Sequence, residues 1–193
     1  MNINNDPKVN RIKSFTTIDA IGIIVGVVLM IIAALIVFPT KSGLNLSLQM
    51  FVVMLVMLVL AGRNGTFVTG IYVLIGALGF PVFVGGYGGT GTLFGARGGF
   101  IIGMILLALM MWRITTFLPE KVWVKIFAIV MGLVMYYLCG SIWYAGYSGL
   151  GVAPGFLESA LPYIPFDLIM AAAAFGISIP LNKIIKIDRH RLT

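Results

Sequence analysis

Charged side chains are scarce in this chain of 193 residues. Only 10% of the residues are charged, whereas 60% are apolar, and the mean hydropathy is +1.08. So few charges could not cover the surface of a water-soluble protein of this length, which excludes an ordinary soluble globule. Lipid must therefore surround most of the chain, and we expect one membrane domain over residues 1–193.

Cysteine and histidine are almost absent. Cys139 is the only cysteine, so an intrachain disulfide and a cysteine-based metal cluster are excluded. The only histidine is His190, and Asp167 is the only acid in the last hydrophobic run before the C-terminal tail. An enzyme would need an acid–base pair or metal ligands, so we expect no enzyme, no metal and no cofactor. The phosphate-binding pattern G-x-x-x-x-G-K-[ST] is also missing, so ATP could drive this protein only through a partner.

Six hydrophobic runs predict an all-α bundle of six transmembrane helices. At 1.5 Å per residue, about 20 apolar residues cross the roughly 30 Å hydrocarbon layer. Gly62-Arg63-Asn64-Gly65 is a tight break between the second and third runs, and Pro180 favours a bend in the sixth. The predicted helices are 20–38, 44–61, 66–80, 100–117, 122–144 and 165–187. Two connections are expected to be irregular: 84–99, which contains eight glycines, and 145–164.

The basic residues predict how the chain crosses the membrane. Lys and Arg near the ends of spans stay on the cytoplasmic side, and a cytoplasmic N-terminus gives eleven basic residues inside and two outside. The inner set is Lys8, Arg11, Lys13, Arg63, Arg113, Lys121, Lys125, Lys183, Lys186, Arg189 and Arg191, and the outer set is Lys41 and Arg97. We therefore expect a multi-pass protein of the cell membrane with both termini in the cytoplasm. The net charge of +7 then needs no nucleic-acid partner.

Two glycine patterns have more than one interpretation. Gly86, Gly88 and Gly91 satisfy G-x-G-x-x-G, but a hydrophobic helix precedes them and no acid follows at the expected distance, so we interpret the segment as a loop that covers a pocket rather than a dinucleotide site. Gly22 and Gly26 form G-x-x-x-G, which permits close helix contact. That contact could lie within the bundle or with another protein.

Three polar or aromatic residues near predicted span ends are candidates for ligand binding. Asp167 could cap the sixth helix or accept ligand N–H groups, because a carboxylate at membrane depth is costly without partners. Trp143 could sit at the membrane interface or stack on a ligand ring. Gln49 could form a hydrogen bond between helices or contact a ligand.

Several motifs from the second helix onward resemble one known family. They are Asn45–Gln49, Gly76–Phe83 followed by Gly85–Gly89, Gly95–Phe100, Gly140 with Trp143, and Pro162–Asp167. Together they resemble the BioY family, the biotin-capturing membrane subunits of energy-coupling factor transporters. The resemblance implies a six-helix subunit with an outward vitamin pocket, a transmembrane coupling protein and two cytoplasmic ATPases as partners. It also implies that small residues on the first helix, here Gly22 and Gly26, contact the coupling protein.

The resemblance implies a binding site with two departures from the family pattern. The expected site consists of Gln49, Gly85, Gly86, Tyr87, Trp143, Asp167 and Met170, together with Arg97 as the outer cation for an acidic ligand. Tyr87 stands where family members can carry Asn, and Met170 where they usually carry Lys. Biotin is therefore the expected ligand, with lipoate as the alternative within the same transporter class. A structural membrane subunit without transport activity remains the alternative from another class.

Overall fold

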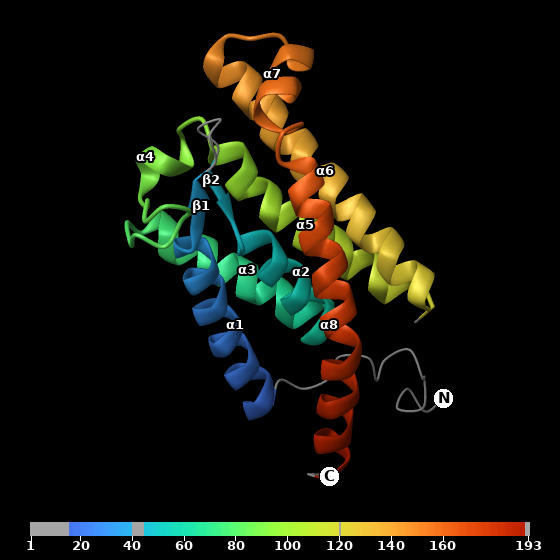
Figure 1. The fold of residues 1–193 in the computed structure, drawn as a ribbon. Helices are drawn as coiled ribbons and strands as arrows, with labels where there is room; N and C mark the ends of the chain where they lie inside the picture. Colours follow the sequence, from blue (N-terminus) through green and yellow to red (C-terminus); the bar gives the residue numbers. More distant parts are fainter. Residues whose placement is uncertain (1–15, 40–44, 120, 192–193) are drawn as a thin grey trace, which may run out of the picture.

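The computed structural model describes residues 16–39, 45–119 and 121–191, and the chain is predominantly helical (Figure 1). Four helices are long and apolar enough to cross a membrane by length and composition: α1 (Thr17–Leu35), α5 (Gly98–Phe117), α6 (Val122–Ser148) and α8 (Ile164–Arg191). The shorter elements are β1 (Val37–Pro39), β2 (Asn45–Ser47), α2 (Gln49–Val59), α3 (Ala61–Ala77), α4 (Thr90–Leu93) and α7 (Val152–Ser159). The predicted all-α membrane fold is confirmed in this arrangement.

The break between the second and third helices lies at Leu60 and not at the predicted glycine pair. Gly62 and Gly65 lie inside α3, where the absence of a side chain permits close packing. A Cβ atom at Gly62 would lie 2.6 Å from the Cα of Trp112, and one at Gly65 would lie 2.7 Å from the sulfur of Met57. Close helix contact rather than chain reversal therefore explains these glycines. Because the break lies at Leu60, α2 has only 11 residues.

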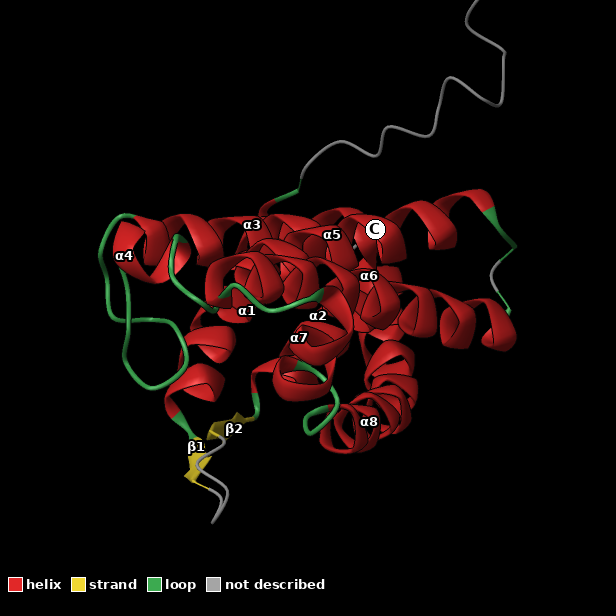
Figure 2. Cartoon of the chain, turned by 90° about the horizontal axis from the view of Figure 1, so that it is seen from above, coloured by secondary structure: helices red, strands yellow, loops and turns green. Residues whose placement is uncertain are grey.

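The first helix ends earlier than predicted, and a short ribbon follows it. Residues 36–38 were expected to be helical, but Pro39 disfavours helical geometry in the residue before it. β1 and β2 instead pair antiparallel, with Phe38 opposite Leu46. Figure 2, which views the molecule from above, shows the two strands at the edge of the molecule.

The start of α1 is fixed by hydrogen bonds that also join it to α3. Thr16 and Asp19 form a reciprocal capping box. The side-chain amide of Asn64 donates to the carboxylate of Asp19 over 2.8 Å. The hydrogen bond between Asn64 and Asp19 therefore connects α3 to the start of α1.

The second predicted irregular segment is partly helical. α6 continues to Ser148 and ends at Gly149, whose φ of 70° is a left-handed cap. The chain then forms α7 before α8 begins at Ile164. Figure 1 shows α7 at the same end of the molecule as α4 and the strand ribbon, opposite the start of α1 and the end of α8.

The glycine-rich connection after α3 is held against α1 and α3. Gly85 and Gly86 have φ values of 82° and 78°, which side-chain-bearing residues rarely adopt. The amide of Gly85 donates to the carbonyl of Ala34 in α1 over 3.3 Å. The buried hydroxyl of Tyr72 donates to the carbonyl of Val82 over 2.8 Å. The predicted loop is therefore an ordered part of the fold.

Candidate functional site

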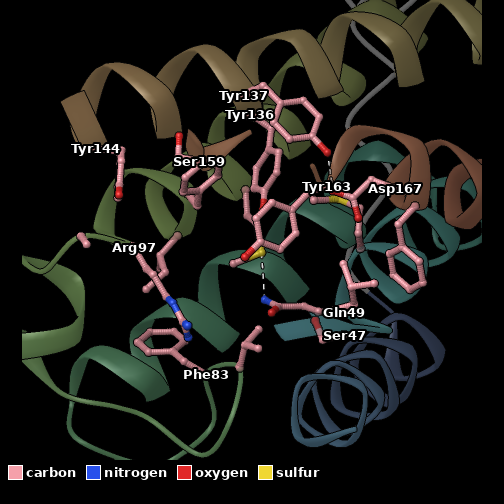
Figure 3. Close-up of a pocket in the computed structure, with 18 of the residues that line it drawn as sticks. Ser47, Gln49, Phe83, Arg97, Tyr136, Tyr137, Tyr144, Ser159, Tyr163 and Asp167 are labelled. Atoms are coloured by element: carbon pink, nitrogen blue, oxygen red, sulfur yellow. Dashed lines mark hydrogen bonds between the residues drawn. The ribbon is translucent and has the colours of Figure 1, made fainter. Parts of the chain in front are cut away.

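A cavity of about 360 Å³ lies at the end of the molecule that carries α4, α7 and the ribbon (Figure 3). Its size is within the range typical of small-molecule sites. The cavity is enclosed by the starts of α2, α5 and α8, the middle and end of α6, the end of α7, and the glycine-rich loop. Its lining residues are Leu46, Ser47, Gln49, Met50, Phe83, Val84, Thr92, Ala96, Arg97, Phe100, Ile101, Met104, Tyr136, Tyr137, Tyr144, Glu158, Ser159, Tyr163, Phe166 and Asp167. Of the predicted site residues, Gln49, Arg97 and Asp167 line this one cavity.

Asp167 is a buried carboxylate in the first turn of α8. Only 7% of its surface is exposed, and the hydroxyl of Tyr137 donates to its Oδ2 atom over 2.5 Å. Its side chain is thus oriented by α6 rather than used to cap its own helix. Because a carboxylate can accept several hydrogen bonds, one partner leaves acceptor capacity facing the cavity.

Gln49 is the first residue of α2, and it is almost fully buried. Its side-chain nitrogen lies 2.9 Å from the sulfur of Met104, which is a weak acceptor. A ligand could offer this amide a stronger partner. Figure 3 shows the side-chain nitrogen of Gln49 directed into the cavity.

Aromatic side chains form the wall between the polar groups. Phe100 and Tyr136 meet edge to face at a centroid distance of 5.3 Å, and Tyr136 and Tyr137 do so at 5.1 Å. Tyr163, just before α8, also lines the cavity. Our sequence analysis missed these residues, although the adjacent tyrosines in a hydrophobic helix were a detectable signal. The wall suits a ligand with an apolar body.

Arg97 is the one basic side chain among the cavity-lining residues. It directly precedes α5, and its guanidinium carbon lies 5.9 Å from the ring centre of Tyr87. Burial raises the pKa of Tyr163, against an opposing effect of Arg97, so Tyr163 keeps its proton at neutral pH. In Figure 3, Arg97 and Asp167 lie on opposite sides of the cavity.

Five predicted site residues lie outside the lining. Tyr87 is exposed and reaches the cavity only through Arg97. Trp143 does not stack into the cavity, because its indole N–H donates to the carbonyl of Gly95 over 3.0 Å and its ring packs near Gly98. The remaining three, Gly85, Gly86 and Met170, do not line the cavity either, although Gly85 and Gly86 directly follow the lining residues Phe83 and Val84.

The two glycines of α1 face the bundle. A Cβ atom at Gly22 would lie 3.1 Å from the side chain of Leu60, and one at Gly26 would lie 2.8 Å from that of Val68. These distances favour internal packing, one of the two roles considered for G-x-x-x-G. Within the described chain, Gly22 and Gly26 thus contact α3 and the residue that precedes it. Their expected contact with a coupling protein stays a prediction.

Comparison with known proteins gives a consistent result. The model of the BioY family matches residues 7–187. A protein of Pyrococcus horikoshii named as a probable biotin transporter BioY is 37% identical over 67% of this chain and 75% of its own length. The biotin transporter BioY of Thermotoga maritima is 33% identical over 72% of this chain and 80% of its own length.

A solved structure has the same fold. It is described as the S-component for biotin from an ECF-type ABC transporter. The two structures align with a TM-score of 0.74 over 88% of this chain and 95% of the other, at 22% sequence identity. At that identity the similarity shows the shared fold alone.

Proposed function

The chain belongs to the BioY family, and we propose that it captures biotin in its cavity as the first step of uptake across the membrane. The observation that carries this proposal is the distribution of polar groups in the cavity: a carboxylate at one side, a guanidinium at the other, and an aromatic wall between them. Biotin has a matching order of groups, with ureido N–H donors on a compact ring system, an apolar chain and a terminal carboxylate.

Asp167 receives the ring and Arg97 the acidic tail in this proposal. In a partly dehydrated cavity, a carboxylate opposite the ligand's carboxylate would be repelled, whereas ureido N–H groups suit an acceptor that has no proton to give. Arg97 can bind the tail through a charge-assisted hydrogen bond. Gln49, which lines the same cavity, would add a polar contact to the ligand.

Lipoate is the alternative ligand within this transporter class. It shares a sulfur-containing ring and an acidic tail with biotin, but it offers no ring N–H group. The free acceptor capacity of Asp167 would then stay unpaired in a buried position, which is unfavourable. A role as a structural subunit leaves the cavity and its opposed charges without a purpose. The acceptor capacity of Asp167 therefore favours biotin over lipoate, and the cavity with its opposed charges favours a capture role over a structural one.

Transport requires partners that supply energy. The chain has no Walker-type phosphate-binding pattern. We propose that it works with a transmembrane coupling protein and two cytoplasmic ATPases, in line with the solved structure's description as a component of an ECF-type ABC transporter. No nucleic acid or resident cofactor is required by this mechanism, since the vitamin is the cargo.

The proposed orientation puts the cavity on the outer side of the cell membrane. The start of α1 and the end of α8 lie at the opposite end of the molecule from α4, α7 and the strand ribbon (Figure 1). The cavity lies at the end that carries α4, α7 and the ribbon. A cysteine introduced at the exposed Ser148 should react with an impermeant thiol reagent added outside. A cysteine at Asn5, which lies outside the described residues, should react only after the membrane is opened. The reverse pattern would contradict the orientation.

Transport itself can be tested in bacteria that neither make biotin nor take it up. Cells that express this chain with a coupling protein and ATPases should grow on trace biotin, and cells that express the energising proteins alone should not. An Asp167→Asn variant expressed at the same level is the matched control, and it should need more biotin for equal growth. Growth that is independent of this chain would contradict the proposed function.

A further inference from the structure

The lining of the cavity includes three further oxygen-bearing side chains that free biotin has no group to match. Tyr144 comes from α6, and Glu158 and Ser159 are the last two residues of α7. We call these three residues the α7 oxygen cluster. Figure 3 shows Tyr144 and Ser159 on the same side of the cavity as Arg97, and Asp167 on the other side.

Ser159 is the member of the cluster that most needs an explanation. It is 9% exposed, and within the described part of the chain its Oγ atom has no hydrogen-bond partner. Buried hydroxyl groups are nearly always paired, because leaving one unpaired costs stability. A hydroxyl that lines a cavity without a protein partner indicates that a ligand group or water completes it.

Glu158 adds a negative charge to the cluster. Its side chain is exposed and lies beside the hydroxyl of Tyr144. Arg97 lines the same cavity, yet within the described residues the two opposite charges form no ion pair. An unpaired cation and anion at one end of a cavity provide places for two opposite charges on a ligand.

The chemistry of the α7 oxygen cluster matches an ammonium group. An ammonium has three N–H donors and no acceptor. The carboxylate of Glu158 and the oxygens of Tyr144 and Ser159 provide three acceptors, one of which is charged and gives a stronger hydrogen bond. The lining as a whole holds two carboxylates and one guanidinium, so an additional positive charge on the ligand would improve the charge balance.

We propose that the cavity also binds biotin joined by an amide bond to the side-chain amine of lysine. The α-ammonium would lie on the α7 oxygen cluster, and the exposed Arg97 would turn outward to bind the α-carboxylate, which lies beyond the position of the acid of free biotin. Such a conjugate is released when a protein that carries the vitamin on lysine is hydrolysed. Because Glu158 and Arg97 are exposed, this end of the cavity communicates with solvent and leaves room for the longer tail. The inference rests on the proposed function, since Asp167 would hold the same ring in both ligands.

A set of three ligands tests this inference on the unmodified, purified protein: free biotin, the lysine conjugate, and the conjugate with its α-amine acetylated. We expect saturable binding of the conjugate, and about tenfold weaker binding after acetylation, which is typical for loss of one charged hydrogen bond. Equal affinity of the two conjugates would overturn the ammonium assignment. Binding of free biotin without binding of the conjugate would overturn this inference alone, whereas failure of all three ligands to bind would overturn the proposed function as well.

Two variants locate the effect on the cluster. Glu158→Gln should lower the affinity for the conjugate, relative to that for free biotin, by about tenfold. Tyr144→Phe should lower the same ratio by a smaller factor, about threefold, because a neutral acceptor is lost. Tyr147→Phe is the matched control, since Tyr147 is on the same helix, is exposed and does not line the cavity. An unchanged ratio in Glu158→Gln would contradict the assignment even if the conjugate binds.

Discussion

Replacing Asp167 with Asn tests the proposed ring site most sharply, because the structure limits how the new side chain can respond. The hydroxyl of Tyr137 donates to one carboxylate oxygen of Asp167. An Asn side chain would keep its single oxygen for Tyr137 and would turn its NH₂ group toward the cavity. There it would meet the ureido N–H groups of biotin, donor against donor. The loss of one hydrogen bond to a charged group is worth about 1.5 to 3 kcal/mol, which corresponds to roughly 10- to 150-fold in affinity.

Equilibrium binding of labelled biotin to the purified Asp167→Asn variant measures this loss. Lipoate should be affected much less, because it has no ring N–H to lose. Asp19→Asn is the matched control: Asp19 is also a carboxylate in the first turn of a helix, but it lies at the start of α1 and does not line the cavity. Its dissociation constant for biotin should equal that of the parent. If Asp167→Asn binds biotin as tightly as the parent, the assignment of the ring to Asp167 is wrong.

Three further changes test other parts of the site and fold. Arg97→Gln should weaken binding of biotin about tenfold but that of its neutral amide less than threefold, and equal losses would contradict the role of Arg97 at the acid. Trp143→Phe removes the N–H that donates to the carbonyl of Gly95, two residues before Arg97, and we expect this hydrogen bond to help position Arg97. The variant should cost about 0.5 to 1.5 kcal/mol in binding of biotin and less in binding of the amide, and unchanged binding of both ligands would refute this positioning role of Trp143. Gly26→Leu should lower the midpoint of thermal unfolding and reduce binding and uptake together, because the added side chain would clash inside the bundle. Val25→Leu, on the exposed side of α1, is the control and should be tolerated. Intact binding with failed uptake in Gly26→Leu would instead place that glycine at a contact with a partner protein.

The hydrophobic runs predicted the membrane fold well, because lipid imposes one requirement on every span: a long apolar stretch with its backbone paired internally. The long helices α1, α5 and α6 follow the predicted ranges within a few residues, apart from the end of α6. The break near Gly62 was misplaced because a glycine can mark either a turn or a close helix contact. The position of Trp112, on a helix that is far away in the sequence but packed against Gly62, decides between a turn and a close helix contact. Sequence spacing does not contain that information.

The candidate site was predicted in part for a similar reason. Asp167, Arg97 and Gln49 attracted attention because each is polar in an apolar context, and all three line the cavity. Tyr137 and Ser159 were missed because an aromatic residue or a small hydroxyl in a hydrophobic helical protein is ordinary. Their importance comes from what they contact or fail to contact in three dimensions.

Binding of labelled biotin to the unmodified, purified protein, with unlabelled biotin and lipoate as competitors, tests the central proposal most directly. We expect saturable binding at one site per chain, full displacement by biotin, and at least about tenfold weaker competition by lipoate, since it leaves the acceptor at Asp167 unpaired. Absence of saturable biotin binding, or equal competition by lipoate, would contradict the account.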